Sequence, residues 1–133
     1  MKSNTIRYRI RWGDTDAAGI VFYPNYFHWF DMATHEFFRS IGLTVTQLMD
    51  EGVVLPILNA TSDFKMPLYY DDEVEVRSNI SEVRNKSFRI DHVVVRGSDV
   101  TGLGSEWRAW VSRTGEKFAA EPIPDYVREL FGH

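Results

Sequence analysis

The strongest constraint on the fold is a stretch of large aromatic side chains with helical spacing. Between residues 24 and 41, one face of a helix would carry Tyr26, Phe27, Phe30, Ala33, Phe37, Phe38 and Ile41. Pro24 suits the first turn of such a helix, and Gly42 suits the position just beyond its end. A face this bulky needs a sheet to pack against. The sequence therefore predicts one long helix over residues 24–41 lying on a β-sheet.

Alternating polar and apolar side chains predict strands on both sides of this helix. Before it, one face of an alternating segment carries Ile6, Tyr8, Ile10 and Trp12. After it, Thr44 and Gln47 have the spacing of a capping box, which predicts a second, short helix over residues 45–51. Further strands are predicted over 53–66 (one bent strand or two), 73–83, 87–96 and 103–113, with turns at 99–102 and 114–115 and a short helix over 124–131.

This order of elements predicts an α+β protein, with helices on one face of an antiparallel sheet. We expect residues 1–133 to form a single domain, since a chain of this length with 44% hydrophobic residues can bury its own core. Only one helix is long enough to cover the centre of the sheet. The other face of the sheet, or its edge, would stay exposed in a monomer, so we expect a homo-oligomer.

Composition excludes several classes of function. The chain has no cysteine, which rules out disulfides, zinc fingers and thiol nucleophiles. A net charge of −4 argues against binding to a nucleic acid backbone. No apolar run approaches the ~20 residues that span a membrane, and the first residues do not resemble a secretory signal, so we expect a cytoplasmic protein. His28 and His35 are about 10.5 Å apart along the predicted helix, too far to share one metal ion, and no metal site is expected.

Two carboxylates stand just before the long helix. Asp14 and Asp16 lie in a loop bounded by Gly13 and Gly19. The start of a helix carries unpaired N–H groups and a partial positive charge, which can stabilise an oxyanion and keep a carboxylate ionised. An Asp at such a position is also a common helix cap or Asx turn. The residues alone leave both roles open.

Residues 13–31, GDTDAAGIVFYPNYFHWFD, resemble the signature of the 4-hydroxybenzoyl-CoA thioesterase family. The pattern is Asp-x-Asp, two small residues, Gly, a few apolar residues, Tyr-Pro-Asn-Tyr and an aromatic helix. The resemblance implies the hot-dog fold, in which an antiparallel sheet wraps around one long central helix and dimers join their sheets edge to edge. It implies an acyl-CoA thioesterase acting on aromatic or other compact acyl groups. No cofactor is implied, because CoA is part of the substrate.

The resemblance also implies roles by position. Asp16 corresponds to the family's catalytic carboxylate, which attacks the thioester carbonyl or activates water. The backbone N–H of Tyr23 corresponds to the donor that polarises this carbonyl. Phe22, Tyr26 and Asp31 are the implied contacts of the acyl group. Asp31 would accept a hydrogen bond from a ring hydroxyl, and the alternative is an exposed acid on the polar edge of the helix.

The second implied site is the segment that contains Arg84, Lys86 and Ser87. Within VRNKSF, it resembles the family's Arg-x-Lys-Ser segment, which contacts the nucleotide and phosphates of CoA. Cationic side chains and a hydroxyl suit phosphate groups. By itself, a turn with two cations between strands is typical of a solvated hairpin tip.

Two departures from the family pattern keep other functions open. Ala17 stands where related members have Pro, and Phe22 where they have Trp. The form Asp-Ala-small-Gly also occurs in short- and medium-chain acyl-CoA thioesterases, although these usually place His at the position of Tyr23. The alternatives are a short- or medium-chain aliphatic acyl-CoA thioesterase and a non-catalytic acyl-CoA-binding hot-dog protein. Asp14 is expected to support the loop, and dimers are expected to assemble into tetramers.

Overall fold

The computed structural model describes residues 2–132, which form one five-stranded antiparallel sheet, a small three-stranded sheet and three α-helices. The elements, in chain order, are β1 (Ser3–Arg9), the short 3-10 helix η1 (Trp12–Asp14), α1 (Asn25–Ser40), α2 (Val45–Asp50), β2 (Val53–Val54), β3 (Ile57–Phe64), β4 (Glu73–Val83), β5 (Ser87–Arg96), β6 (Asp99–Ala109), β7 (Val111–Thr114), β8 (Lys117–Ala120) and α3 (Asp125–Phe131). The strand order is β1-β4-β5-β6-β3 in the large sheet and β2-β7-β8 in the small one.

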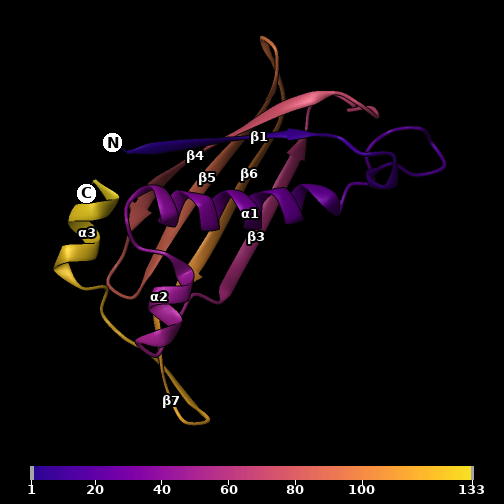
Figure 1. Cartoon of the computed structure of the whole chain (residues 1–133). Helices are drawn as coiled ribbons and strands as arrows, with labels where there is room; N and C mark the ends of the chain where they lie inside the picture. Colours follow the sequence, from indigo (N-terminus) through magenta and orange to yellow (C-terminus); the bar gives the residue numbers. More distant parts are fainter. Residues whose placement is uncertain (1, 133) are drawn as a thin grey trace.

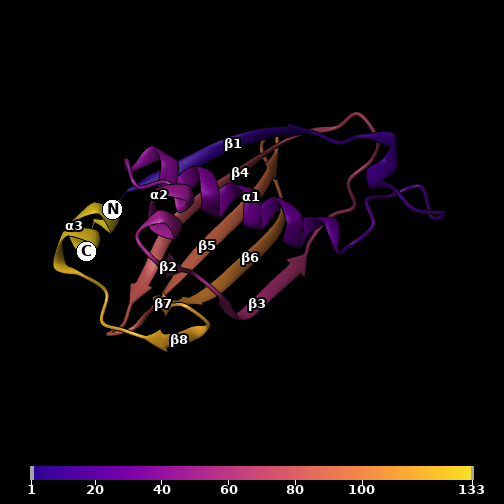
Figure 2. The same cartoon turned by 60° about the horizontal axis from the view of Figure 1, so that its bottom comes forward.

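Helix α1 lies across one face of the large sheet, and the strands curve around it (Figures 1 and 2). Helix α2 lies beside the C-terminal end of α1, and α3 lies at the same end of the molecule. The predicted α+β class and the sheet wrapped around one long helix are confirmed.

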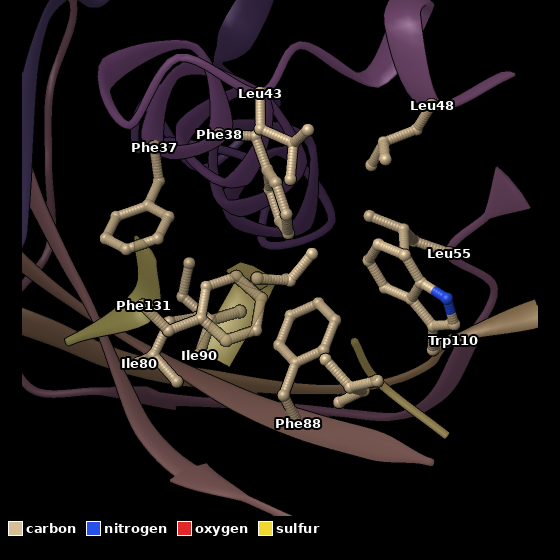
Figure 3. Close-up of a cluster of buried hydrophobic side chains, with 12 residues drawn as sticks. Phe37, Phe38, Leu43, Leu48, Leu55, Ile80, Phe88, Ile90, Trp110 and Phe131 are labelled. Carbon is tan, nitrogen blue, oxygen red and sulfur yellow. The ribbon is translucent and has the colours of Figure 1, made fainter. Parts of the chain in front are cut away.

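The core consists of two apolar clusters, one at each end of α1. The cluster at the C-terminal end includes Phe38 of α1, Phe88 of β5 and Phe131 of α3, and Figure 3 shows Phe38 pointing from the helix toward the sheet. The cluster at the N-terminal end includes Tyr26 and Trp29 of α1. A row of buried polar side chains from α1, β4 and β5 separates the two clusters: Thr34, Ser78 and His92.

The signals that bound the helices in the sequence act as predicted. Helix α1 begins directly after Pro24 and ends before Gly42, whose φ of 79° only glycine adopts easily. Thr44 and Gln47 form the predicted capping box at the start of α2. The buried face of α1 differs in one respect: Trp29 is buried, whereas Phe27 is partly exposed.

The segment 53–66 contains two strands, which is one of the two predicted alternatives. Other predicted strand boundaries are wrong. The strand predicted over 103–113 is divided between β6 and β7 at Trp110. The turn predicted at 99–102 is part of β6, and the chain reverses instead at Gly97, which has a φ of 63°. Strand β8 was not predicted. Trp12 lies beyond the end of β1 and is 75% exposed, so it does not share the buried face of that strand.

Candidate active site

The loop before α1 is held in a narrow hairpin by backbone hydrogen bonds. The N–H of Phe22 donates to the carbonyl of Asp14 at 2.9 Å, and the N–H of Asp16 donates to the carbonyl of Ile20 at 3.0 Å. The side-chain amide of Asn25, in the first turn of α1, also donates to the carbonyl of Asp14 at 2.8 Å. The loop is therefore tied directly to the start of the helix.

Asp14 is the anchor of this loop. Its side chain is buried and accepts hydrogen bonds from the hydroxyl of Tyr8 at 2.7 Å and from the N–H of Arg11 at 2.8 Å. Burial alone would raise the pKa of Asp14, but these hydrogen bonds and the charge of Arg11 outweigh it and hold the pKa below its ordinary value. With these partners, the carboxylate ties the loop to strand β1.

Asp16 lies at the exposed turn of the same loop. Its Oδ1 accepts a hydrogen bond from the N–H of Ala18 at 2.8 Å, which is the Asx turn that its position before a helix allowed. Its Oδ2 has no hydrogen bond or ion pair within residues 2–132. In a single chain the side chain faces solvent, with one oxygen fixed and the other free.

The backbone N–H of Tyr23 also has no hydrogen-bond partner among the described residues. Its carbonyl already takes part in the first turn, because it accepts from the N–H of Tyr26 at 3.2 Å. The amide thus stands at the positive end of α1, where unpaired donors can stabilise an oxyanion.

A cleft of about 280 Å³ opens at this end of the helix, between the loop, the first turn of α1 and residues 64–68. Tyr23 and Tyr26 both line it, and Phe64 closes one side. Burial raises the pKa of Tyr26, whose ring lies edge-on to Phe64 with 4.8 Å between the centroids. Phe22, predicted to contact the acyl group together with Tyr26, is partly exposed and is not among the residues that line this cleft.

Asp31 is paired rather than merely solvated. Its Oδ1 lies 2.8 Å from a terminal nitrogen of Arg108 on β6 and 3.6 Å from Nε2 of His35 on the next turn of α1. The Asp31 side chain is about half exposed, whereas that of Arg108 is almost fully buried. A buried cation thus holds a carboxylate at the surface.

Arg108 belongs to a buried polar network that sequence reasoning missed. Glu106 accepts from Arg108 at 2.9 Å, from Nε2 of His92 at 3.0 Å and from the hydroxyl of Thr34. Ser78 lies 2.7 Å from Nδ1 of the same imidazole. Burial would raise the pKa of Glu106, but the hydrogen bond to His92 and the charge of Arg108 lower it to about 2. His92 is therefore buried with both ring nitrogens in contact with polar partners.

One signal in the sequence could have revealed this network. Residues 102, 104, 106 and 108 alternate onto the inward face of β6, as Gly, Gly, Glu and Arg, and are all buried or nearly so. Two charged residues that follow two glycines on the same face of a strand are unusual for a core face, and they indicate a buried ion pair.

Of the predicted CoA-binding residues, Arg84 and Lys86 lie in the turn between β4 and β5, and Ser87 is the first residue of β5. The guanidinium of Arg84 stacks over the ring of Trp107, 4.1 Å from its centroid. Arg128 of α3 donates to the carbonyls of Arg84 at 2.7 Å and Asn85 at 3.1 Å. The backbone N–H of Trp110 donates to the carbonyl of Lys86 at 2.8 Å. The side chains of Lys86 and Arg84 are exposed, and that of Ser87 is half-buried.

Within one chain the two groups of predicted residues are not brought together. Helix α1 has 16 residues and is therefore ~24 Å long. The loop with Asp16 lies at one end of the molecule (Figure 1). The turn with Arg84, Lys86 and Ser87 lies beside α3, at the other end.

Residues 2–132 contain no group of three His, Cys, Asp or Glu side chains arranged to hold a metal ion. Over the same residues, no helix is both long enough and apolar enough to cross a membrane.

The model of the thioesterase-like superfamily matches residues 10–131 of the chain. Among curated proteins, the 4-hydroxybenzoyl-CoA thioesterase of Pseudomonas sp. (strain CBS-3) is 36% identical over 135 residues, which cover 95% of this chain and 96% of that protein. Among solved structures, a gentisyl-coenzyme A thioesterase is 40% identical, with a TM-score of 0.86, and the match covers 98% of this chain and all of that one.

A mutant 4-hydroxybenzoyl-CoA thioesterase solved with 4-hydroxybenzoyl-CoA superposes with a TM-score of 0.91 at 32% identity. That match covers 98% of this chain and 99% of the other. The hot-dog fold expected from residues 13–31 is thereby confirmed.

Proposed function

This chain belongs to the thioesterase-like superfamily and is an acyl-CoA thioester hydrolase, and we propose that its substrates carry an aromatic or similarly compact acyl group, such as 4-hydroxybenzoyl or benzoyl. The observation that carries this proposal is the cleft at the start of α1, where the unpaired N–H of Tyr23 stands beside the largely buried ring of Tyr26. An aromatic acyl group suits walls of this kind, because aromatic rings pack well edge to face.

We assign the catalytic carboxylate to Asp16. Its free Oδ2 attacks the thioester carbonyl carbon, or it takes a proton from a water molecule that attacks the same carbon. In either case the carbonyl oxygen becomes negative, and the N–H of Tyr23 donates to it. The intermediate collapses by breaking the C–S bond and releasing CoA; after direct attack, water then hydrolyses the acyl-Asp16 anhydride. A thiolate leaves readily, so no strong acid is needed at the sulfur.

The proposal requires a second copy of the chain. The CoA-binding turn at Arg84, Lys86 and Ser87 is remote from Asp16 of the same chain, and Asp16 is exposed. Strand β3 is an edge of the large sheet, is mostly exposed and carries one charged residue, Asp63, so it can pair with another copy. We propose dimers joined at this edge that assemble further into tetramers, with each active site shared between copies. Sedimentation as a monomer at micromolar concentration would contradict this assembly.

An aliphatic substrate is the second candidate. The segment Asp16-Ala17-Ala18-Gly19 resembles that of short- and medium-chain acyl-CoA thioesterases. The cleft volume of about 280 Å³ accommodates a short aliphatic chain as well as one aromatic ring. The cleft is lined by Tyr26 and Phe64, whose rings meet edge to face, and such a surface favours an aromatic acyl group over an aliphatic one. For this reason we rank the aromatic substrate first.

The test is release of free thiol from a panel of acyl-CoAs. The panel contains 4-hydroxybenzoyl-CoA, benzoyl-CoA, butyryl-CoA, octanoyl-CoA and palmitoyl-CoA. We expect kcat/KM for the two aromatic substrates to exceed that for the others by about tenfold or more, which corresponds to ~1.4 kcal/mol of transition-state binding. A maximum at butyryl- or octanoyl-CoA would establish the aliphatic candidate instead. Tight binding of aryl-CoA without any thiol release would indicate a non-catalytic binding protein.

A further inference from the structure

Arg108 is held from three directions and cannot rotate away from Asp31 without breaking other contacts. One terminal nitrogen donates to the carbonyl of Leu55 at 3.1 Å. The other donates both to Glu106 Oε2 at 2.9 Å and to Asp31 Oδ1 at 2.8 Å. Its side chain is only 6% exposed, so these hydrogen bonds form in a region of low dielectric, where they are stronger than at the surface.

The support behind Arg108 is itself rigid. Glu106 is fixed by His92 and Thr34, and His92 stacks against Phe30 with 4.9 Å between the ring centroids and an interplanar angle of 3°. Because Glu106 is fixed by packing and hydrogen bonds, it also restricts the orientation of the Arg108 guanidinium that it binds.

The two oxygens of Asp31 are therefore unlike each other. Oδ1 is held by Arg108 and faces His35, 3.6 Å away. Oδ2 has no hydrogen bond or ion pair in the part of the chain that the structure describes, and the side chain is about half exposed. One oxygen is anchored and the other remains available as an acceptor.

Arg108 also lines a cavity of about 270 Å³ between α1, α2 and the residues around β2. Apart from His35 and Arg108, the residues that line this cavity are apolar: Val45, Met49, Val54, Leu55 and Pro56. An apolar group thus has room beside His35 and Arg108, the two residues that Asp31 contacts.

We propose that Arg108 is a positioning residue: it fixes Oδ1 of Asp31 so that Oδ2 is presented to accept a hydrogen bond from a hydroxyl on the acyl group. This inference rests on the proposed function, because it assumes that the acyl group reaches Asp31. Asp31 and Glu106 share the single cation of Arg108, so the three side chains together carry an excess of one negative charge, and a charged oxygen is a strong acceptor. Arg108 therefore sets the preference for hydroxylated over unsubstituted rings.

The experiment measures binding of two inert thioether analogues, 4-hydroxyphenacyl-CoA and phenacyl-CoA, by calorimetry with the full chain. In both, a methylene group between sulfur and carbonyl prevents hydrolysis. We expect the wild type to bind the hydroxylated analogue about tenfold more tightly, the effect of one charge-assisted hydrogen bond. Asp31→Ala and Arg108→Met should each reduce this preference to less than about twofold, and the double variant should reduce it no further. Binding of phenacyl-CoA should change little.

Two further variants guard against misfolding and general loss of binding. Removal of Arg108 leaves Glu106 buried without its cation, so Arg108→Met is also made together with Glu106→Gln. Arg77→Met is the matched control, since Arg77 is paired to Glu75 at 3.0 Å on an exposed surface and should leave the preference unchanged.

Three results would overturn the inference. The wild type could bind both analogues equally well, Arg108→Met could weaken binding of both analogues equally, or Arg108→Met could keep the wild-type preference for the hydroxylated analogue. Because the analogues are inert, this outcome is independent of thiol release. A wild type that prefers the hydroxylated analogue but hydrolyses no aryl-CoA would contradict the proposed function and leave the role of Arg108 standing.

Discussion

Gly104 lies directly beneath Phe30, and a Cβ atom added at Gly104 would come within 2.2 Å of Cε2 of that ring. Gly104 is opposite His92 in the pairing of β5 with β6, and His92 stacks on the same ring. Helix and sheet therefore meet at a point where even a methyl group has no space. The closeness of this contact sets the depth at which α1 lies in the curved sheet.

Gly104→Ala should consequently destabilise the fold. We expect the free energy of unfolding to fall by about 1–3 kcal/mol, the usual cost of an overpacked core site. Urea unfolding followed by circular dichroism measures it. Gly13→Ala is the matched control, because a Cβ there meets nothing within 4 Å and should cost less than about 0.5 kcal/mol. Equal midpoints for the two variants would contradict the close contact.

Glu106 should make the fold sensitive to acid. Its pKa is about 2 in the folded chain and near 4.5 when unfolded, so the unfolded state binds the proton more readily. The ionised Glu106 carboxylate therefore stabilises the folded state fully above about pH 5, and this contribution is lost as the pH falls from there toward 2. At ~1.4 kcal/mol for each pKa unit, it adds roughly 3 kcal/mol to the free energy of unfolding.

The measurement is the free energy of unfolding in urea at pH 7, 5, 4 and 3. The wild type should lose stability progressively between pH 5 and 3. Glu106→Gln should be less stable than the wild type at pH 7 but should lose less of its remaining stability on acidification. Parallel losses in the two proteins would show that other carboxylates, such as Asp14, dominate the acid response.

Asp16→Asn should abolish most turnover while leaving the fold and substrate binding intact. The amide neither attacks the thioester nor removes a proton from water, so kcat should fall by about 10²–10⁴-fold. Steady-state thiol release with the best acyl-CoA of the panel measures kcat, and calorimetry with phenacyl-CoA measures binding. Asp99→Asn, at an exposed position at the start of β6, is the control and should retain full activity. Normal turnover by Asp16→Asn would remove Asp16 from the reaction.

Arg128→Met should weaken binding of the CoA portion. Arg128 donates to the carbonyls of Arg84 and Asn85, so its loss leaves the proposed CoA-binding turn less ordered. We expect KM for acyl-CoA to rise about three- to tenfold with kcat nearly unchanged, and KM for the acyl-pantetheine that lacks the nucleotide to stay constant. Arg39→Met, at an exposed arginine paired with Glu36, serves as the comparison. A similar rise in KM for both substrates would place the effect outside the nucleotide site.

The sequence predicted the regular elements well where local chemistry marks their ends. Pro24 and Gly42 bound α1 closely, and the alternation in β4 and β5 led to both strands. The sequence places the start of β6 too late, because a glycine such as Gly102 is typical of a turn. In the structure a Cβ at Gly102 would lie 3.3 Å from Tyr26, so this glycine permits close packing inside a strand.

The candidate site was only partly predictable. The loop residues Asp14 and Asp16 and the amide of Tyr23 are close in sequence, and one motif contains them all. The pairing of Asp31 with Arg108 joins residues 77 positions apart, and that of Thr34 with Glu106 joins residues 72 apart. Such contacts depend on the register between β5 and β6 and on where α1 crosses them, which no local pattern contains.

The row formed by Thr34, Ser78 and His92 divides the interior beneath α1 into the two apolar clusters. Because the two clusters have no member in common, substitutions in one should change the free energy of unfolding independently of substitutions in the other. A designer could reshape the substrate end around Tyr26 while stiffening the opposite end around Phe131. The polar partition would keep the two changes from interfering.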